Sequence, residues 1–241
     1  MNNQVNLSNL LSATADTIRN NAQLAGIFLA IMIPVSTAMT VFQGGGRSFG
    51  MNFGFMLGED VMAQGVLAII VVLAGSIVSI VATYWLVAGM TRGSISPGFD
   101  RFWPYIGISI LYGFALMFGF ILLIVPGIIL MVRWVPLLPA VIDRQSGAMN
   151  AFSDSFDMTR GHSWSVFGAG LIVFIGMMIM SAVIGGVAVG VGAVFGGASG
   201  IVAGAIASTA QLAANIVGYA FCVGAYHLMR DTTEGVTGVF E

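Results

Sequence analysis

The chain has 241 residues, of which 58% are hydrophobic and only 7% are charged. A soluble domain is about 45–50% apolar and about 25% charged, so eight basic and ten acidic residues are too few to cover a soluble globule. This composition excludes an ordinary cytosolic enzyme, a disordered protein and a nucleic-acid-binding protein with a basic surface. It indicates an integral membrane protein.

Residues 1–23 are predicted to form a short amphipathic helix at the membrane interface. Its apolar residues recur at helical spacing and are Leu7, Leu10, Leu11, Ala15 and Ile18. Polar residues such as Ser8 and Arg19 occupy the other face, which is the pattern of a helix lying on a bilayer.

Five long apolar runs follow, and a membrane span needs about 20 such residues. The third run, Tyr105–Ile142, has 38 residues and would reach about 57 Å as one helix, nearly twice the hydrocarbon core of about 30 Å. It must fold back, and Pro126 and Gly127 are the predicted helix break, because proline disfavours helix before it and glycine permits a reversal.

The predicted fold is therefore an all-α membrane protein, a polytopic bundle of six transmembrane helices whose fourth helix is short or broken near Pro136. The membrane domain covers 24–229, and a cytoplasmic tail covers 230–241. The six predicted spans are 24–42, 62–90, 105–125, 126–142, 164–191 and 201–229.

The arginines support six spans independently of length, because positive residues concentrate in cytoplasmic loops. With both termini cytoplasmic, only Arg47 lies on the outer side. The cytoplasmic side carries Arg19, Arg92, Arg101, Arg144, Arg160 and Arg230. A single crossing by the third run would remove this bias.

Two connecting segments are notable, although neither is long enough to be a domain. Residues 43–61 form the main outer loop and residues 143–163 the main inner loop. In the inner loop, Met149, Phe152 and Phe156 fall on one helical face, which predicts a cytoplasmic interfacial helix.

Arg133 is a charged residue inside the fourth predicted span. A central arginine costs about 2.5–3.5 kcal/mol on insertion scales, and the nearby prolines weaken the span further. We therefore expect this span to pack inside the bundle or to line a wet cavity. One hypothesis is that Arg133 binds an anionic group, such as a lipid phosphate or a solute carboxylate. The other is that it hydrogen-bonds backbone carbonyls freed by the prolines, or extends toward the interface.

Polar residues also form stripes in two spans. The last span carries Gln211, Asn215 and Tyr219, and the second carries Ser76, Ser79 and Thr83. With Arg133 they would line a polar ligand pocket. The alternative is interhelical hydrogen bonding, worth about 0.6–2 kcal/mol per contact.

A glycine series recurs every four residues and comprises Gly192, Gly196, Gly200 and Gly204. Small residues at this spacing let helices approach closely, so the series predicts a tight helical hairpin between the last two spans. A glycine-lined oligomeric pore is the alternative.

The stretch Ile124–Trp164 resembles a known family. It contains Val125-Pro126-Gly127-Ile128-Ile129-Leu130, then Pro139-Ala140-Val141-Ile142, and then Met158-Thr159-Arg160-Gly161 before Trp164. Together with Thr14–Gln23, it is similar to the six-span bacterial inner-membrane family UPF0259. Its relatives are the membrane domains attached to some glycerophosphoryl diester phosphodiesterases. The resemblance implies a bacterial inner-membrane location and an envelope or lipid-related role, and it carries over no catalytic residue.

The sequence thus predicts a non-enzymatic inner-membrane protein without a cofactor or a metal site. Its expected role is to bind or handle a membrane lipid or an amphiphile, or to support envelope homeostasis. A small-solute transporter or channel is the first alternative, and a structural assembly partner of another membrane protein is the second. The expected partners are membrane lipids, with a homo-oligomer or another envelope protein left open and no nucleic acid.

Overall fold

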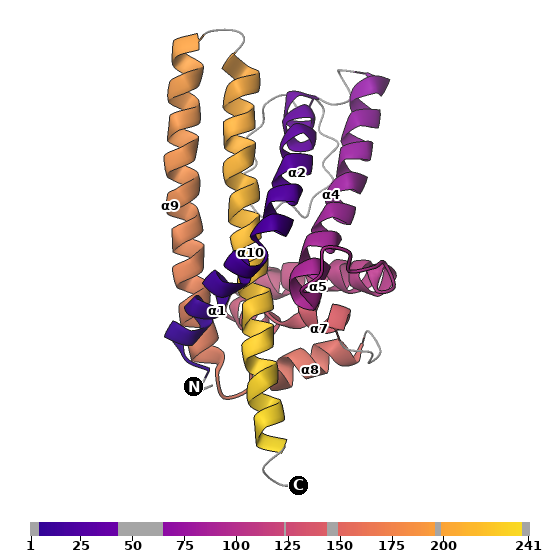
Figure 1. Ribbon diagram of the computed structural model, residues 1–241, viewed down its shortest axis with the longest axis vertical. Coiled ribbons are helices and arrows are strands. Elements are labelled where there is room, and N and C mark those ends of the chain that lie inside the picture. Colours follow the sequence, from indigo (N-terminus) through magenta and orange to yellow (C-terminus); the bar gives the residue numbers. More distant parts are fainter. Residues whose placement is uncertain (1–4, 43–64, 123, 144–148, 196–198, 238–241) are drawn as a thin grey trace. The chain divides into compact units, whose positions relative to one another are not determined.

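The computed structural model describes residues 5–42, 65–122, 124–143, 149–195 and 199–237. Within these ranges every regular element is a helix (Figure 1). The helices are α1 (Leu7–Asn20), α2 (Ala22–Phe42), α4 (Val66–Arg92), α5 (Phe102–Leu122), α6 (Ile124–Arg133), α7 (Leu137–Asp143), α8 (Asn150–Met158), α9 (Ser163–Phe195) and α10 (Ser199–Thr237). The residues Arg144 and Gly196, and the whole predicted outer loop 43–61 with Arg47, lie outside the described residues.

Within the described ranges, six segments are long and apolar enough to cross a membrane, which confirms the predicted polytopic all-α fold. They are Ala22–Met39, Val66–Arg92, Phe102–Ile121, Val125–Asp143, Ser163–Ala188 and Gly204–Asp231. The helices α6 and α7 together make the fourth segment.

The fourth span is broken near Pro136, as predicted. The helix α6 ends at Arg133 and α7 begins at Leu137. Proline has no backbone N–H to donate, so Pro136 interrupts the hydrogen-bonding pattern of one continuous helix. Of this span, 44% is buried, against 17% of Phe102–Ile121, which agrees with packing inside the protein.

The chain reversal before the fourth span differs in position from the predicted break at Pro126 and Gly127. The helix α5 ends at Leu122 and α6 already begins at Ile124, so Pro126 lies in the first turn of α6, where a missing N–H is tolerated. Gly127 serves close packing, because a Cβ there would lie 2.7 Å from the ring of Phe120 on α5.

The contacts divide the chain into two units. The first comprises residues 1–22, 84–175 and 217–241, and the second comprises 23–83 and 176–216. In the second unit, the side chains of Ala68 and Val72 on α4 are buried against Met39 of α2. A Cβ at Gly75 would lie 2.6 Å from the Met39 sulfur, so this glycine allows the two helices to pack closely.

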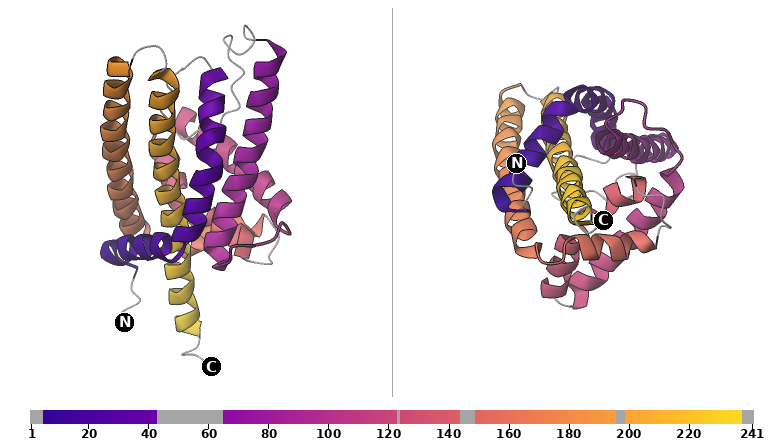
Figure 2. Two further views of the ribbon diagram at one scale, coloured as in Figure 1. Left: turned by 45° about the horizontal axis from the view of Figure 1, so that its top comes forward. Right: turned by 60° about the horizontal axis from the view of Figure 1, so that its bottom comes forward.

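In the first unit, α1 runs across the start of α9 and the last part of α10 (Figure 2). It begins where the Asn6 side chain accepts a hydrogen bond from the Asn9 N–H at 2.9 Å, a standard N-cap. Leu10 is fully buried against α9 and α10 in a cluster with Val166, Ala169, Phe221, Ala225 and Met229. Protein, rather than the bilayer, therefore covers the central apolar residue of the predicted interfacial helix.

The predicted inner-loop helix is present as α8. Its Ala151 and Ser155 are buried, whereas Met149, at its start, is 71% exposed and Phe156 is 41% exposed. The ring of Phe152 packs edge-on against Trp134, with centroids 5.1 Å apart. This contact ties α8 to the break between α6 and α7.

Gly224 on α10 sets the closest approach of α1. A Cβ there would lie 2.9 Å from the backbone carbon and oxygen of Ala13. Overpacking of this kind costs about 1–3 kcal/mol, so Gly224→Leu should make the amides of α1 exchange hydrogen about 5- to 150-fold faster. Hydrogen–deuterium exchange of the purified protein measures this. The matched control is Gly107→Leu, where nothing lies within 4 Å of the added Cβ. Equal exchange in Gly224→Leu and the parent would contradict the packing described here.

Candidate functional site

The end of α4 carries a local signal that shapes the candidate site. Gly93 adopts a left-handed conformation with φ of 61°, and the Ser94 N–H donates to the Gly89 carbonyl at 3.1 Å. This is a Schellman ending, for which glycine is the favoured residue. It stops α4 at Arg92 and turns the chain toward α5.

Arg92 connects three segments of the first unit. Its Nη1 and Nη2 donate to the two Asp100 carboxylate oxygens at 2.7 and 2.8 Å. Nη2 also donates to the Ile142 carbonyl at 3.1 Å, and Nη1 also donates to the Pro97 carbonyl. The Arg92 guanidinium holds the pKa of the Asp100 carboxyl below its usual value. Arg92 thus joins α4 to the following turn and to the end of α7.

Asp143, the last residue of α7, makes the second set of polar contacts. One of its oxygens accepts from the Tyr226 hydroxyl at 2.7 Å and from Arg230 Nη1 at 2.9 Å. These bonds join α7 to α10. The end of α7 is therefore tied on one side to α4 and on the other to α10.

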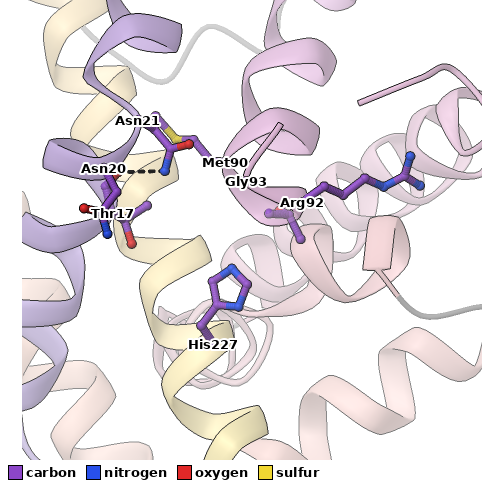
Figure 3. Close-up of a pocket in the computed structure, with 8 residues that line it drawn as sticks. Thr17, Asn20, Asn21, Met90, Arg92, Gly93 and His227 are labelled. Atoms are coloured by element: carbon purple, nitrogen blue, oxygen red, sulfur yellow. Dashed lines mark hydrogen bonds between the residues drawn. The ribbon is translucent and has the colours of Figure 1, made fainter. Parts of the chain in front are cut away.

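A cavity of about 430 Å³ lies in the same unit, and we call it the α1–α4–α10 cavity. Its lining comes from the end of α1, the end of α4 with the following glycine, and one histidine of α10 (Figure 3). The lining residues are Thr17, Asn20, Asn21, Met90, Thr91, Arg92, Gly93 and His227. The site is polar although two of its three helices are candidate spans.

Few groups that line this cavity carry charge. The Arg92 side chain extends away from the other lining residues in Figure 3, toward the bonds to Asp100 described above. The Asn21 amide donates to the Thr17 carbonyl at 2.9 Å, which leaves the Asn21 side-chain oxygen as an acceptor. The remaining lining is neutral and suited to hydrogen bonding with a ligand.

The structure places Arg133 at the end of α6 against α8. Its Nη1 donates to the Phe156 carbonyl at 3.2 Å, and its guanidinium lies 4.4 Å from the centroid of the Phe156 ring. The Ser155 hydroxyl donates to the Arg133 carbonyl at 2.9 Å. A backbone carbonyl of α8 and an aromatic face thus contact this charge, rather than the carbonyls freed by the prolines, and whether Arg133 binds an anion stays a prediction.

The predicted polar stripes lie on α4 and α10, and all six of their residues are half-buried. The hydroxyls of Ser76 and Ser79 donate to carbonyls of their own helix, those of Val72 and Gly75, at 2.7 and 2.8 Å. The Gln211 amide nitrogen lies 3.4 Å from the Asn215 side-chain oxygen. Thr83, Gln211 and Asn215 belong to the second unit, whereas Tyr219 and Arg133 belong to the first. A pocket that combines all of these residues stays a prediction.

The glycine series lies around the α9–α10 connection. Gly192 precedes the end of α9 at Phe195, and Gly200 and Gly204 follow the start of α10 at Ser199. Gly196 lies outside the described residues. The role of this series in helix packing stays a prediction.

Sequence reasoning missed the α1–α4–α10 cavity. Two local signals point to it: the polar cluster Thr17, Asn20 and Asn21 at the end of an amphipathic helix, and His227 at the end of an apolar run. Nothing in local spacing shows that these segments meet. For metals, the described ranges contain no group of three or more His, Cys, Asp or Glu side chains placed to hold an ion.

The Arg92–Asp100 pair makes stability depend on pH. The pKa of Asp100 is lowered in the folded protein, so the pair stabilises the fold above the ordinary Asp pKa of about 3.9 and loses this effect as pH falls through the folded-state pKa. Because Asp100 is 60% exposed, Asp100→Asn should lower the melting temperature by only about 1–3 °C at pH 7. Melting of the detergent-purified protein should show this difference shrinking between about pH 5 and pH 3. The control is Asp157→Asn on the exposed face of α8. A difference that grows on acidification would contradict this role.

Comparison with models of known protein families, with curated proteins and with solved structures finds no match to this chain.

Proposed function

We propose that this chain is a non-enzymatic protein of the bacterial inner membrane that binds a membrane lipid or a similar amphiphile. The α1–α4–α10 cavity is the observation that carries the proposal. Its volume of about 430 Å³ falls within the range of about 300–1,000 Å³ typical of small-molecule sites. A polar cavity at the end of apolar helices suits a molecule with a polar head and apolar tails.

Exposed tryptophans support an interfacial position for this end of the spans. Trp103 in the first turn of α5 is 78% exposed, and Trp164 in the first turn of α9 is 86% exposed. Tryptophan is enriched at the boundary between the bilayer and water. The first unit, which holds both tryptophans, also holds the α1–α4–α10 cavity.

Arginines near these tryptophans support a cytoplasmic orientation. Arg101 and Arg160 precede Trp103 and Trp164 by two and four residues, and Arg19 lies on α1 between the lining residues Thr17 and Asn20. Positive residues favour the cytoplasmic side. We therefore assign the α1–α4–α10 cavity to the inner leaflet, with both termini cytoplasmic.

The chemistry of the α1–α4–α10 cavity favours binding over catalysis. Besides Arg92, its titratable lining residue is His227, and the lining contains no carboxylate to form an acid–base pair with it. The hydroxyls of Thr17 and Thr91 donate to the carbonyls of Ala13 and Val87 in their own helices. The proposed role is to hold a ligand rather than to convert it.

Native mass spectrometry of the detergent-purified protein tests this function. In Asn20→Trp a large side chain enters the α1–α4–α10 cavity from a position whose side chain is exposed, so folding should be retained. The lipid-bound fraction should fall at least about fivefold, because the added indole excludes the headgroup. The control is Asn150→Trp at the exposed start of α8. Melting temperature and size-exclusion profile verify folding.

Other outcomes separate the competing proposals. Equal lipid occupancy in Asn20→Trp and in the parent would contradict binding at the α1–α4–α10 cavity. A lipid lost only in Arg133→Leu would instead assign the ligand to Arg133. Stoichiometric recovery of one other membrane protein, without bound lipid, would favour the role of an assembly partner.

A further inference from the structure

We infer that the α1–α4–α10 cavity takes an uncharged headgroup bearing hydroxyl groups, such as a glycerol or sugar moiety. This inference rests on the proposed function and names the class of ligand. The hydrogen-bonding state of the lining residues carries it.

The Arg92 guanidinium has no terminal N–H left for a ligand. Its two Nη atoms carry four hydrogens, and they make four bonds: two to Asp100, one to Pro97 and one to Ile142. The Asp100 carboxylate also neutralises the charge. Arg92 therefore gives the α1–α4–α10 cavity neither a phosphate-binding fork nor a free positive charge.

Two hydroxyls in the lining act as acceptors, because each has already donated its hydrogen within its own helix. The Thr17 hydroxyl donates its hydrogen to the Ala13 carbonyl at 2.7 Å, and the Thr91 hydroxyl donates its hydrogen to the Val87 carbonyl at 2.7 Å. The oxygens keep lone pairs that can still accept, as does the side-chain oxygen of Asn21. A ligand that satisfies these acceptors must donate hydrogen bonds.

This pattern discriminates between headgroup classes. A phosphate monoester carries negative charge and mostly accepts, so the Thr17 and Thr91 oxygens cannot donate to it and no uncommitted arginine in the lining neutralises it. An ammonium group donates but carries a charge, and no carboxylate lines the α1–α4–α10 cavity to neutralise it. A hydroxyl donates without charge and also accepts from the Asn20 amide.

Binding of lipids with matched acyl chains to the detergent-purified full-length protein tests this inference. The probes are dioleoylglycerol, glucosyl dioleoylglycerol, dioleoyl phosphatidic acid and dioleoyl phosphatidylethanolamine, with free glucose and glycerol as soluble counterparts. The two uncharged lipids should bind at least about tenfold more tightly than phosphatidic acid or phosphatidylethanolamine.

Thr17→Val tests the role of the acceptors. It removes one acceptor with little change in volume, so the affinity for the uncharged lipids should fall about three- to tenfold. The matched control is Thr209→Val, because the Thr209 hydroxyl makes the same bond within its helix, to Ala205 at 2.7 Å, outside the α1–α4–α10 cavity. An equal loss in both variants would overturn the assignment of Thr17.

The remaining outcomes distinguish this inference from the proposed function. Tighter binding of phosphatidic acid or phosphatidylethanolamine, still abolished by Asn20→Trp, would overturn the headgroup class and leave lipid binding in place. If free glucose binds as tightly as the glucosyl lipid, the hydroxyl-bearing class of ligand would be supported. The ligand would then be a soluble molecule rather than a lipid headgroup. If none of the four lipids binds, or if Asn20→Trp leaves their binding unchanged, both the headgroup inference and the proposed function would be overturned.

Discussion

The hydrogen bonds that hold the end of α7 are the constraint on which the α1–α4–α10 cavity depends. Arg92 of α4 donates to the Ile142 carbonyl, and Tyr226 and Arg230 of α10 donate to the Asp143 carboxylate. Such charge-assisted bonds are stronger than neutral ones. They tie the ends of α4 and α10 to one short helix, and these same two ends supply lining residues of the α1–α4–α10 cavity. Because Arg92 pairs with Asp100, the lining of the cavity is nearly neutral.

Three of the few charged residues in this chain are arginines that join helices of the first unit. Arg92 and Arg230 join helices through carboxylates, and Arg133 contacts a carbonyl and an aromatic ring on α8. An arginine buried without a partner would be costly near a bilayer, so these contacts stabilise the fold. Arg92, Arg133 and Arg230 therefore each join two helices of the first unit.

Much of the fold could be predicted because its signals are local. Apolar length predicts six spans, and Pro136 predicts the break between α6 and α7. The position of the reversal after α5 was less predictable, because Pro126 is compatible with a first helical turn.

The candidate site could not be predicted, because its contacts join distant residues: Arg92 meets Ile142 fifty positions away, and Asp143 meets Arg230 eighty-seven positions away. The contact of Arg133 with the Phe156 carbonyl was not predicted either, because the two residues are 23 positions apart.

The central claim is that a lipid headgroup occupies the α1–α4–α10 cavity. Photo-crosslinking in native membranes tests it most directly, with a lipid that carries a diazirine in its headgroup, followed by peptide mapping of the adducts. The account predicts adducts on residues 17–21 and 90–93, which line the cavity. Adducts confined to other segments, such as α8 or the second half of α9, with none on 17–21 or 90–93, would contradict it.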